Sequence, residues 1–379
     1  MQESLPDRRT RMTKALRIDK SAEEGLKELL RFLLESGKVK GVLTLRKMGE
    51  YGAISHSLIT NPGDIDSTLP LFPLMPVNLG QQLSLLTLIG PATDPIAVVL
   101  RPCELRAFVE LVKRNQGSLE NLLFISSTCG GVYPLEMAVT GDIDEQLPQY
   151  WKAVEQGEAI PDIRPACKAC AHFVPYNSDI TISLLGTKNI DKQSVLLLNT
   201  DKGESFVEGI PGQFSEEGLD SAAIEQIRNK REAEKQKLSD ELETKTLGID
   251  DLTKTFSRCI DCHNCSKVCP ICYCHVCFFD SKESEHGPVY YETALEKMGC
   301  VSMLSDTTFY HLVRLFHVSA SCVGCGQCAD VCPAHIPLWA ISLKVGDAVQ
   351  KAFDYLPGKD IEEGLPLTTF IPEEFAGIE

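Results

Sequence analysis

The sequence predicts an α/β domain, in which helices cover a mixed sheet, followed by a mainly helical domain. Three observations support this order. Strand-length apolar runs alternate with amphipathic helical patterns over the first part of the chain. A charged stretch with few apolar residues follows, and two matching cysteine runs lie beyond it, with helical patterns between and after them.

The elements of the first domain follow from apolar spacing. Helices are expected where apolar residues recur every three or four positions, at residues 22–36, at 79–89 and in the stretch that begins at 102. Strands are expected at short apolar or alternating runs, at residues 41–45, 53–59, 96–100, 122–126, 179–185 and 194–199.

Two cysteines of this domain lie at strand ends. Cys103 follows the run at 96–100 and begins a helix, where the backbone dipole favours a thiolate, and Cys129 follows the run at 122–126. Ligands of open α/β sheets collect at such carboxyl ends. With Cys167 and Cys170, these residues form a set of four thiols that we expect to hold one metal centre. Zinc and unconnected buried thiols are the alternatives.

Composition shifts divide the chain into five parts. We expect a basic N-terminal arm at residues 1–20, the α/β domain at 21–220, a charged helical linker at 221–250, the cysteine-rich domain at 251–355 and an acidic tail at 356–379. The arm is basic without an apolar segment behind it, and the tail is expected to lie extended on the surface or on a partner.

The two cysteine runs read CIDCHNCSKVCP at residues 259–270 and CVGCGQCADVCP at 322–333. Both follow C-x2-C-x2-C-x3-C-P, the run that binds 4Fe-4S clusters in bacterial ferredoxins, where the fourth cysteine ligates the other cluster. This rule predicts two ligand sets: Cys259, Cys262, Cys265 and Cys332; and Cys322, Cys325, Cys328 and Cys269. A pair of structural zinc sites is the alternative. By the same chemistry, the four thiols of the first domain become a candidate third cluster.

Four further cysteines, Cys272, Cys274, Cys277 and Cys300, lie near the first run. They are consistent with another cluster, with a zinc site or with unligated thiols, and their spacing does not decide. The runs begin 63 positions apart, and helical patterns cover residues 307–319 and 338–353. The second domain is therefore predicted to be a helical dicluster ferredoxin.

The overall composition excludes several classes of protein. A net charge of -16 argues against binding to nucleic acid, which needs a basic face. No apolar run approaches the length of a membrane span. Sixteen cysteines in a chain of 379 residues without a secretory signal indicate metal ligation in a reducing compartment, so we expect a cytoplasmic protein.

With these residues in hand, the chain resembles the beta subunits of coenzyme F420-dependent hydrogenases and dehydrogenases, in particular the formate dehydrogenase beta subunit. The segments that carry the resemblance are residues 33–43 (LLESGKVKGVL), 98–107 (VVLRPCELRA), 128–130 (TCG), 164–170 (RPACKAC), 179–183 (DITIS) and 268–274 (VCPICYC). Residues 309–338 also resemble the helical ferredoxin of heterodisulfide reductase. The resemblance implies an iron–sulfur flavoprotein in which FAD exchanges a hydride with coenzyme F420 and passes single electrons to clusters. It also implies that the four thiols of the first domain bind the cluster near the flavin.

The chain departs from this pattern in one segment. Members of the family carry a glycine-rich segment before the first helix, but residues 18–25 read IDKSAEEG, whose acidic side chains repel a pyrophosphate. FAD is therefore left open as a cofactor. Lys40, Arg46 and Arg101 are candidate phosphate or coenzyme contacts, with surface ion pairs as the alternative.

Two redox functions are compatible with these features. The favoured one is an iron–sulfur electron-transfer subunit between the catalytic alpha subunit of a formate dehydrogenase or hydrogenase and a heterodisulfide-reductase-like electron-transfer subunit. The alternative is an FAD-containing oxidoreductase subunit with its own hydride-transfer site for coenzyme F420 or NAD(P)H. A zinc-stabilised interaction protein is the non-redox alternative. No acid–base or nucleophile set stands at a recognisable spacing, so no catalytic residue is assigned.

Overall fold

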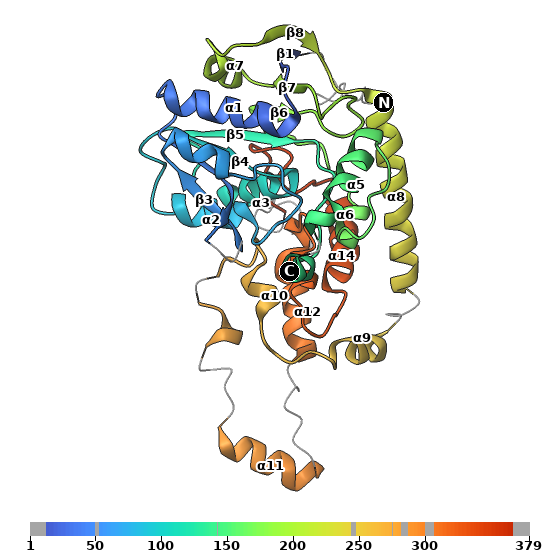
Figure 1. The fold of residues 1–379 in the computed structure, drawn as a ribbon. Coiled ribbons are helices and arrows are strands. Elements are labelled where there is room, and N and C mark those ends of the chain that lie inside the picture. The colour runs from blue at the N-terminus through green and yellow to red at the C-terminus, as the bar shows by residue number, and fades with distance from the viewer. Residues whose placement is uncertain are drawn as a thin grey trace, which may run out of the picture.

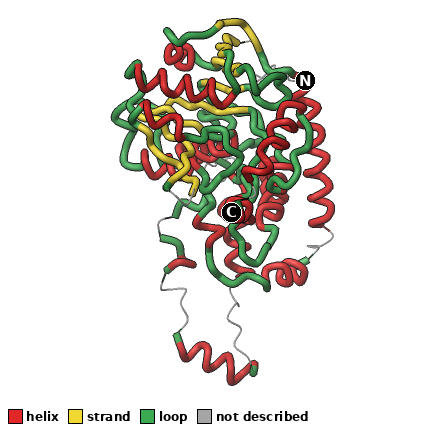
Figure 2. Tube along the Cα trace, in the orientation of Figure 1, coloured by secondary structure: helices red, strands yellow, loops and turns green. Residues whose placement is uncertain are grey.

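The computed structural model describes residues 13–49, 53–141, 143–243, 248–274, 276–281, 287–299 and 307–366. Within these residues one eight-stranded mixed sheet lies at one end of the molecule and a helical part lies at the other (Figure 1, Figure 2). The predicted fold class, an α/β domain followed by a mainly helical one, is confirmed.

The sheet has the strand order β3-β2-β4-β5-β6-β7-β1-β8. Its strands are β1 (Thr13–Ile18), β2 (Gly41–Met48), β3 (Ala53–Ile59), β4 (Ile96–Val99), β5 (Leu122–Ser127), β6 (Ile180–Ile182), β7 (Ser194–Leu198) and β8 (Gln213–Glu217). The four strands β2, β4, β5 and β6 pair in parallel, and the strands on either side of them pair antiparallel. Their shared carboxyl ends therefore meet at one edge of the sheet.

The helices up to the end of the sheet are α1 (Ala22–Glu35), α2 (Leu79–Thr87), α3 (Pro102–Lys113), α4 (Leu135–Thr140), α5 (Ile143–Gln156), α6 (Pro165–Lys168) and α7 (Asp201–Val207). Those that follow are α8 (Ser221–Glu243), α9 (Ile249–Phe256), α10 (Asn264–Lys267), α11 (Pro288–Met298), α12 (Thr307–Val318), α13 (Gln327–Asp330) and α14 (Leu338–Ala352). The helices and strands expected from apolar spacing are confirmed, most with boundaries within two residues of the expected ones.

Alternate residues of the central strands feed two separate cores. Val42 and Ala97 pack with α1 on one face of the sheet, whereas their neighbours Leu43 and Val98 pack with α2 and α3 on the other. This is the two-residue period of a strand whose two faces are both covered. Packing on both faces fixes the position of the edge where the parallel strands end, and α3 begins at that edge.

The expected basic arm at residues 1–20 is wrong for its second half. Residues 13–18 form β1, which pairs with both β7 and β8, and Ala15 and Leu16 are fully buried. Apolar residues lie between the basic ones in this segment, and they are buried in the sheet. The expectation of an exposed arm depended on the basic residues alone. Residues 1–12 lie outside the described residues.

The charged helix α8 runs along the side of the molecule and packs against it at several points (Figure 1). Ile224 and Ile227 join the core under the sheet, and Leu242 joins the core of the helical part. The Nζ atom of Lys235 lies 2.6 Å from a carboxylate oxygen of Asp347 on α14. The helix therefore holds the two parts of the chain together.

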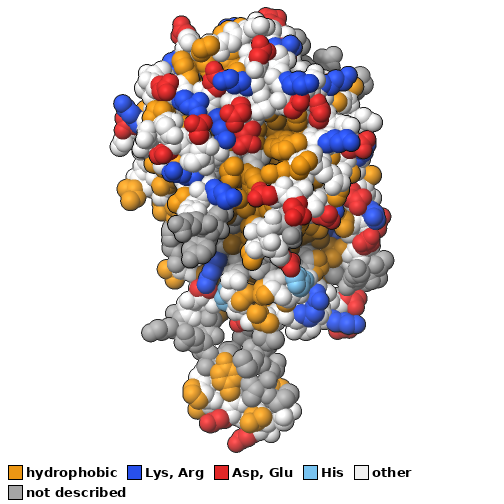
Figure 3. Space-filling view, in the orientation of Figure 1, with side chains coloured by type: hydrophobic (Ala, Val, Ile, Leu, Met, Phe, Trp, Pro, Cys, Tyr) orange, Lys and Arg blue, Asp and Glu red, His pale blue; other side chains and the backbone are white. Residues whose placement is uncertain are grey.

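The surface carries both signs of charge. On the face shown in Figure 3, lysine and arginine side chains are interspersed with acidic ones, and hydrophobic side chains gather near the middle. None of the helices within the described residues is long and apolar enough to cross a membrane.

Candidate metal centres

The first predicted ligand set lies around one cavity. Cys259 and Cys262 come from the loop that leads into α10, Cys265 lies in α10 and Cys332 comes from the end of the second run. Tyr310 and His311 of α12 line the same cavity. The loop turns sharply because Asp261 and His263 adopt left-handed backbone conformations, with φ of 56° and 55°. The crossing of Cys332 into this set is the arrangement that the dicluster rule predicts.

The second predicted set lies around α13. Cys322, Cys325 and Cys328 follow one another on the loop and helix of the second run, and Cys269 lies within electrostatic reach of all three sulfurs. The remaining residue of the set thus comes from the first run, 53 positions or more away along the chain. The two runs exchange their fourth cysteines in space.

The third set is assembled from three separate segments. Cys103 lies in the first turn of α3, Cys129 follows β5, Cys167 lies in α6 and Cys170 follows it; all four line one cavity. Cys325 of the second set lines the same cavity. The second and third sets are therefore immediate neighbours.

Backbone amides donate hydrogen bonds to sulfurs in all three sets. The N–H groups of Asp261, Gly324, Gln327, Gly131 and Val132 donate to the sulfurs of Cys259, Cys322, Cys325, Cys129 and Cys167 respectively. Such N–H···S bonds stabilise thiolates and tune the reduction potential of an iron–sulfur cluster. They are a feature of the donor set that fits cluster binding in this chain.

Most of these thiols favour the protonated form when no cation is bound. Burial raises the pKa of Cys167 and Cys325 to about 12 and that of Cys322 to about 11. The exception is Cys269, whose pKa is lowered to about 6, chiefly by a hydrogen bond from the Cys272 thiol. Because metals bind thiolates, loading these sites releases protons and is favoured by higher pH.

The cysteine sets are spread around cavities. Among the described residues, no three His, Cys, Asp or Glu side chains converge closely enough to hold one metal ion. The first and third sets each line a cavity instead. A polynuclear cluster, whose iron atoms each take one thiolate, is compatible with such an arrangement.

Of the four additional cysteines, Cys300 lies outside the described residues, and the other three are not brought together into one site. Cys272 lies beside Cys269, to which it donates a hydrogen bond. Cys274 is exposed, and Cys277 precedes a short helical turn at some distance along the chain.

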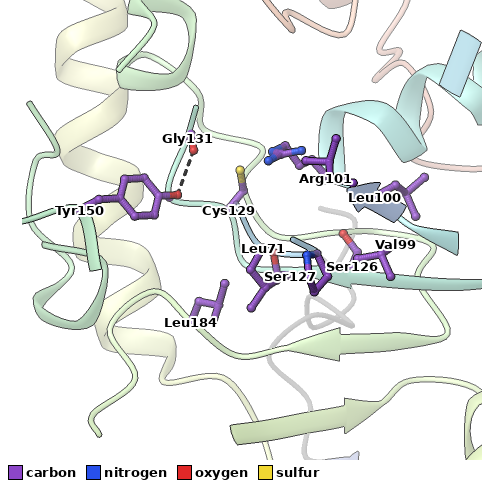
Figure 4. A pocket seen from close by; sticks show the side chains of 13 residues that line it. Leu71, Val99, Leu100, Arg101, Ser126, Ser127, Cys129, Gly131, Tyr150 and Leu184 are labelled. Atoms are coloured by element: carbon purple, nitrogen blue, oxygen red, sulfur yellow. Dashed lines mark hydrogen bonds between the residues drawn. The ribbon is translucent and has the colours of Figure 1, made fainter. Parts of the chain in front are cut away.

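Of the three candidate coenzyme contacts, one lies at the carboxyl edge of the sheet. Arg101 lines both the cavity of the third set and a second cavity beside it. Figure 4 shows the Arg101 side chain next to the Cys129 sulfur. On the wall of the second cavity, the Tyr150 hydroxyl donates to the Gly131 carbonyl oxygen over 2.9 Å. Arg46 pairs with Asp64 at 3.5 Å. Lys40 is exposed and precedes β2, at the opposite end of that strand from the cavity.

Comparisons with known proteins show which proteins this chain is similar to. Residues 317–337, which include the four cysteines of the second run, match the 4Fe-4S binding domain family. Over 366 residues the chain is 28% identical to the F420-dependent formate dehydrogenase subunit beta of Methanocaldococcus jannaschii, covering 88% of this chain and 90% of the relative. The F420-dependent formate dehydrogenase 1 subunit beta of Methanococcus maripaludis is 28% identical over 373 residues, with the same coverage.

The chain is similar to formate dehydrogenase beta subunits over most of its length. The resemblance predicted from the sequence is therefore confirmed, and the match of residues 317–337 supports binding of a 4Fe-4S cluster. A chain of the F420-reducing [NiFe] hydrogenase complex from Methanosarcina barkeri matches the structure with a TM-score of 0.43 at 13% identity, covering 65% of this chain and 97% of that one.

Two arginines at these sites, Arg231, which is partly buried, and Arg164, which is buried, were not among the candidate site residues predicted from the sequence. Arg231 of α8 donates to the carbonyl oxygens of Cys129 and Cys170, at 3.2 and 3.4 Å, and stacks over Phe173. Arg164 forms an ion pair with Asp330 of the second run at 2.6 Å. Arg164 belongs to the RPACKAC segment, which was the available signal, whereas Arg231 lies in a stretch whose composition resembles a solvated helix.

Replacing Gly326 with alanine is expected to destabilise the contact between α6 and α13 by about 2 kcal/mol or more. Gly326 has a φ of 77°, and an added Cβ would lie 2.4 Å from the Cβ of Ala166. Thermal unfolding under anaerobic conditions measures the effect. Gly248→Ala is the matched control, because nothing lies within 4 Å of the added atom; equal melting temperatures for the two variants would contradict the close approach.

Proposed function

We propose that the chain is the iron–sulfur electron-transfer subunit of a multi-subunit redox complex of the formate dehydrogenase or hydrogenase type, with three 4Fe-4S clusters. The observation that carries the proposal is the contiguity of the three cysteine sets. The third set shares the lining of its cavity with Cys325 of the second. The second and first sets are linked through their exchanged fourth cysteines, Cys269 and Cys332.

The chain's own residues position and insulate this row of sites. The clusters, when bound, would accept and pass on single electrons. The backbone N–H groups around the sulfurs would stabilise the additional negative charge that arrives with each electron. The apolar residues that pack between α6, α13 and α14, among them Ala166 and Trp339, keep the neighbourhood of the second and third sets at low dielectric.

The partners follow from the same proposal. The relatives are beta subunits of formate dehydrogenases by name, so we propose a catalytic alpha subunit at one end of the row. A heterodisulfide-reductase-like electron-transfer subunit is the proposed partner at the other end. Free thiols in every described cysteine suit a reducing compartment, and we propose a cytoplasmic site of action.

The alternative function, a hydride-transfer site with FAD, is favoured by the cavity beside the third set. Arg101, Ser126 and Tyr150 line it at the carboxyl ends of the parallel strands, where α/β proteins bind ligands. Its volume is about 30 Å³, however, whereas ligand pockets occupy roughly 300 Å³ or more. The residues present do not accommodate a flavin there, and we derive no step through one.

A larger hollow of about 760 Å³ lies near β6 and β7. Its charged lining is already paired: Lys202 lies 3.5 Å from Asp179, and Lys14 forms an ion pair with Glu204. No free cation of the described residues therefore faces it to bind a pyrophosphate. This hollow is large enough for part of FAD, but it does not offer the positive charge that the phosphates of FAD need.

Quantifying metals and flavin in anaerobically purified protein separates the two functions. If the chain is an electron-transfer subunit, called the relay below, we expect about twelve iron atoms per chain, no stoichiometric zinc and the spectroscopic signature of reduced 4Fe-4S clusters. Finding bound FAD that exchanges a hydride with coenzyme F420 or NAD(P)H would contradict the relay and support the alternative function. Zinc without iron would contradict both.

A further inference from the structure

One buried cation lies between the first and second cysteine sets. Arg314 belongs to α12 and is 8% exposed. Its Nη2 atom donates to the carbonyl oxygen of Cys265 over 3.3 Å, and its side chain also donates to the sulfur of Cys272. It is within electrostatic reach of the sulfurs of Cys265, from the first set, and of Cys269 and Cys328, from the second.

No carboxylate of the described residues neutralises this guanidinium. The ion pairs of these residues do not include Arg314, and its Nε atom is buried without a hydrogen-bond partner. Arg164, another buried arginine of the region, has Asp330 as its counter-ion. A buried charge without a counter-charge is costly, by several kcal/mol, and persists only where something compensates it. The sulfurs of the two cysteine sets are the groups that surround it.

We propose that Arg314 is the shared counter-ion of the two ferredoxin clusters and raises their reduction potentials. The inference rests on the proposed function, because it needs clusters in both sets. A 4Fe-4S cluster with four thiolates carries net negative charge, and reduction adds one electron to it. A fixed positive charge stabilises the reduced form more than the oxidised form, and in a buried site solvent screens this interaction weakly. The electron comes from the neighbouring cluster or from a chemical reductant, and no bond to Arg314 forms or breaks.

The position of Arg314 gives the effect a consequence for electron transfer. Because the guanidinium hydrogen-bonds to Cys265 of the first set and is within electrostatic reach of Cys269 and Cys328 of the second, it acts on both potentials in the same direction. The driving force between the two clusters therefore changes less than the potential of either one. Arg314 therefore acts on the clusters through its positive charge and does not carry electrons itself.

The test is a redox titration of the full-length holoprotein, followed by electron paramagnetic resonance, on the wild type, Arg314→Gln and Arg314→Lys. At the wild-type midpoint potentials, we expect the ratio of reduced to oxidised cluster to fall at least about tenfold in Arg314→Gln, which equals about 59 mV for one electron. We expect Arg314→Lys to lie between the two. Arg258→Gln is the matched control: this exposed arginine lies beside Cys259 and donates to the His335 carbonyl oxygen, and water screens its charge.

The outcomes separate failure of the inference from failure of the proposed function. Full iron content in Arg314→Gln with unshifted potentials would overturn the role of Arg314 and leave the relay intact. Absence of any cluster signal in the wild type would overturn the relay itself. If Arg314→Gln loses iron, the redox titration is repeated on Arg314→Met, and shifted or unshifted potentials in that variant decide in the same way. Iron loss in both neutral variants but not in Arg314→Lys supports the counter-ion role, whereas iron loss in all three overturns it.

Discussion

Replacing Cys325 with serine is expected to reduce the iron content from about twelve to about eight atoms per chain and to interrupt electron transfer along the row. Cys325 is a proposed ligand of the second cluster, and it also lines the cavity of the third cysteine set. Its loss therefore removes the middle of the three sites. Iron analysis and reduction of the remaining clusters, observed by electron paramagnetic resonance, measure both effects.

The matched control for this prediction is Cys274→Ser. Cys274 is exposed and lies outside the three sets, so this variant should keep its full iron content and its electron transfer. In Cys325→Ser the sheet should remain folded, because its two cores contain no residue of the second set. Retention of all iron and of full electron transfer in Cys325→Ser would show that the ligand assignment is incorrect.

The local parts of this fold could be predicted from sequence because each depends on nearby residues. The helices α1, α2 and α3 and the strands between them have apolar periods that match their structure. The strands β1 and β8 escaped prediction for a physical reason. In β1 basic residues separate the apolar ones, and β8 reads QFSEE, with a single large apolar residue that is itself 54% exposed. Both strands depend on pairing with distant segments, which leaves little trace in their composition.

The same division applies to the candidate sites. Spacing within the two runs predicts which cysteines belong together. The structure places the first set around one cavity and the cysteines of the second set within electrostatic reach of one another; their role as ligands stays a prediction. The roles of three arginines could not be found in this way. Arg231, Arg314 and Arg164 contact residues of other segments, and an isolated arginine in a charged or mixed stretch resembles any exposed one. Only the three-dimensional contacts show that Arg314 and Arg164 are buried and that all three lie near the cysteine sets.

The C-terminal segment illustrates a further limit of composition. Residues 356–379 were expected to be an acidic tail on the surface or on a partner, and those after 366 lie outside the described residues. Before that point the segment is anchored to α3: Glu110 accepts from the Gly358 N–H group at 2.8 Å, and Arg106 donates to the Pro357 carbonyl oxygen at 2.7 Å. Arg106 also donates to Val323 of the second run. The helix that begins with Cys103 thus holds both the tail and the neighbouring cysteine run.

Breaking the ion pair between Arg164 and Asp330 should be the most destabilising single change at the junction of the two parts. The side chains of the pair are 2% and 7% exposed, and Arg164 also donates to the Met75 carbonyl oxygen at 3.0 Å. Arg164→Met leaves Asp330 buried without its counter-ion, which typically costs 3–5 kcal/mol. Chemical unfolding under anaerobic conditions measures the loss, and the fluorescence of Trp339, which packs against Ala166 and Ala169, reports on this junction.

A double-mutant cycle distinguishes the ion pair from general packing. Asp330→Asn removes the negative charge but keeps an oxygen that can accept the N–H of Leu135, as Asp330 does at 3.1 Å. We therefore expect Arg164→Met combined with Asp330→Asn to be more stable than Arg164→Met alone. Lys235→Met is the control, since it breaks the pair with Asp347 between α8 and α14, whose side chains are 30% and 41% exposed, and should cost less than about 1 kcal/mol. If Arg164→Met cost no more than Lys235→Met, the buried pair would not be what holds the sheet-bearing part to the second cysteine run. The fixed separation of the second and third sets would then depend instead on the apolar packing of Ala166 and Trp339.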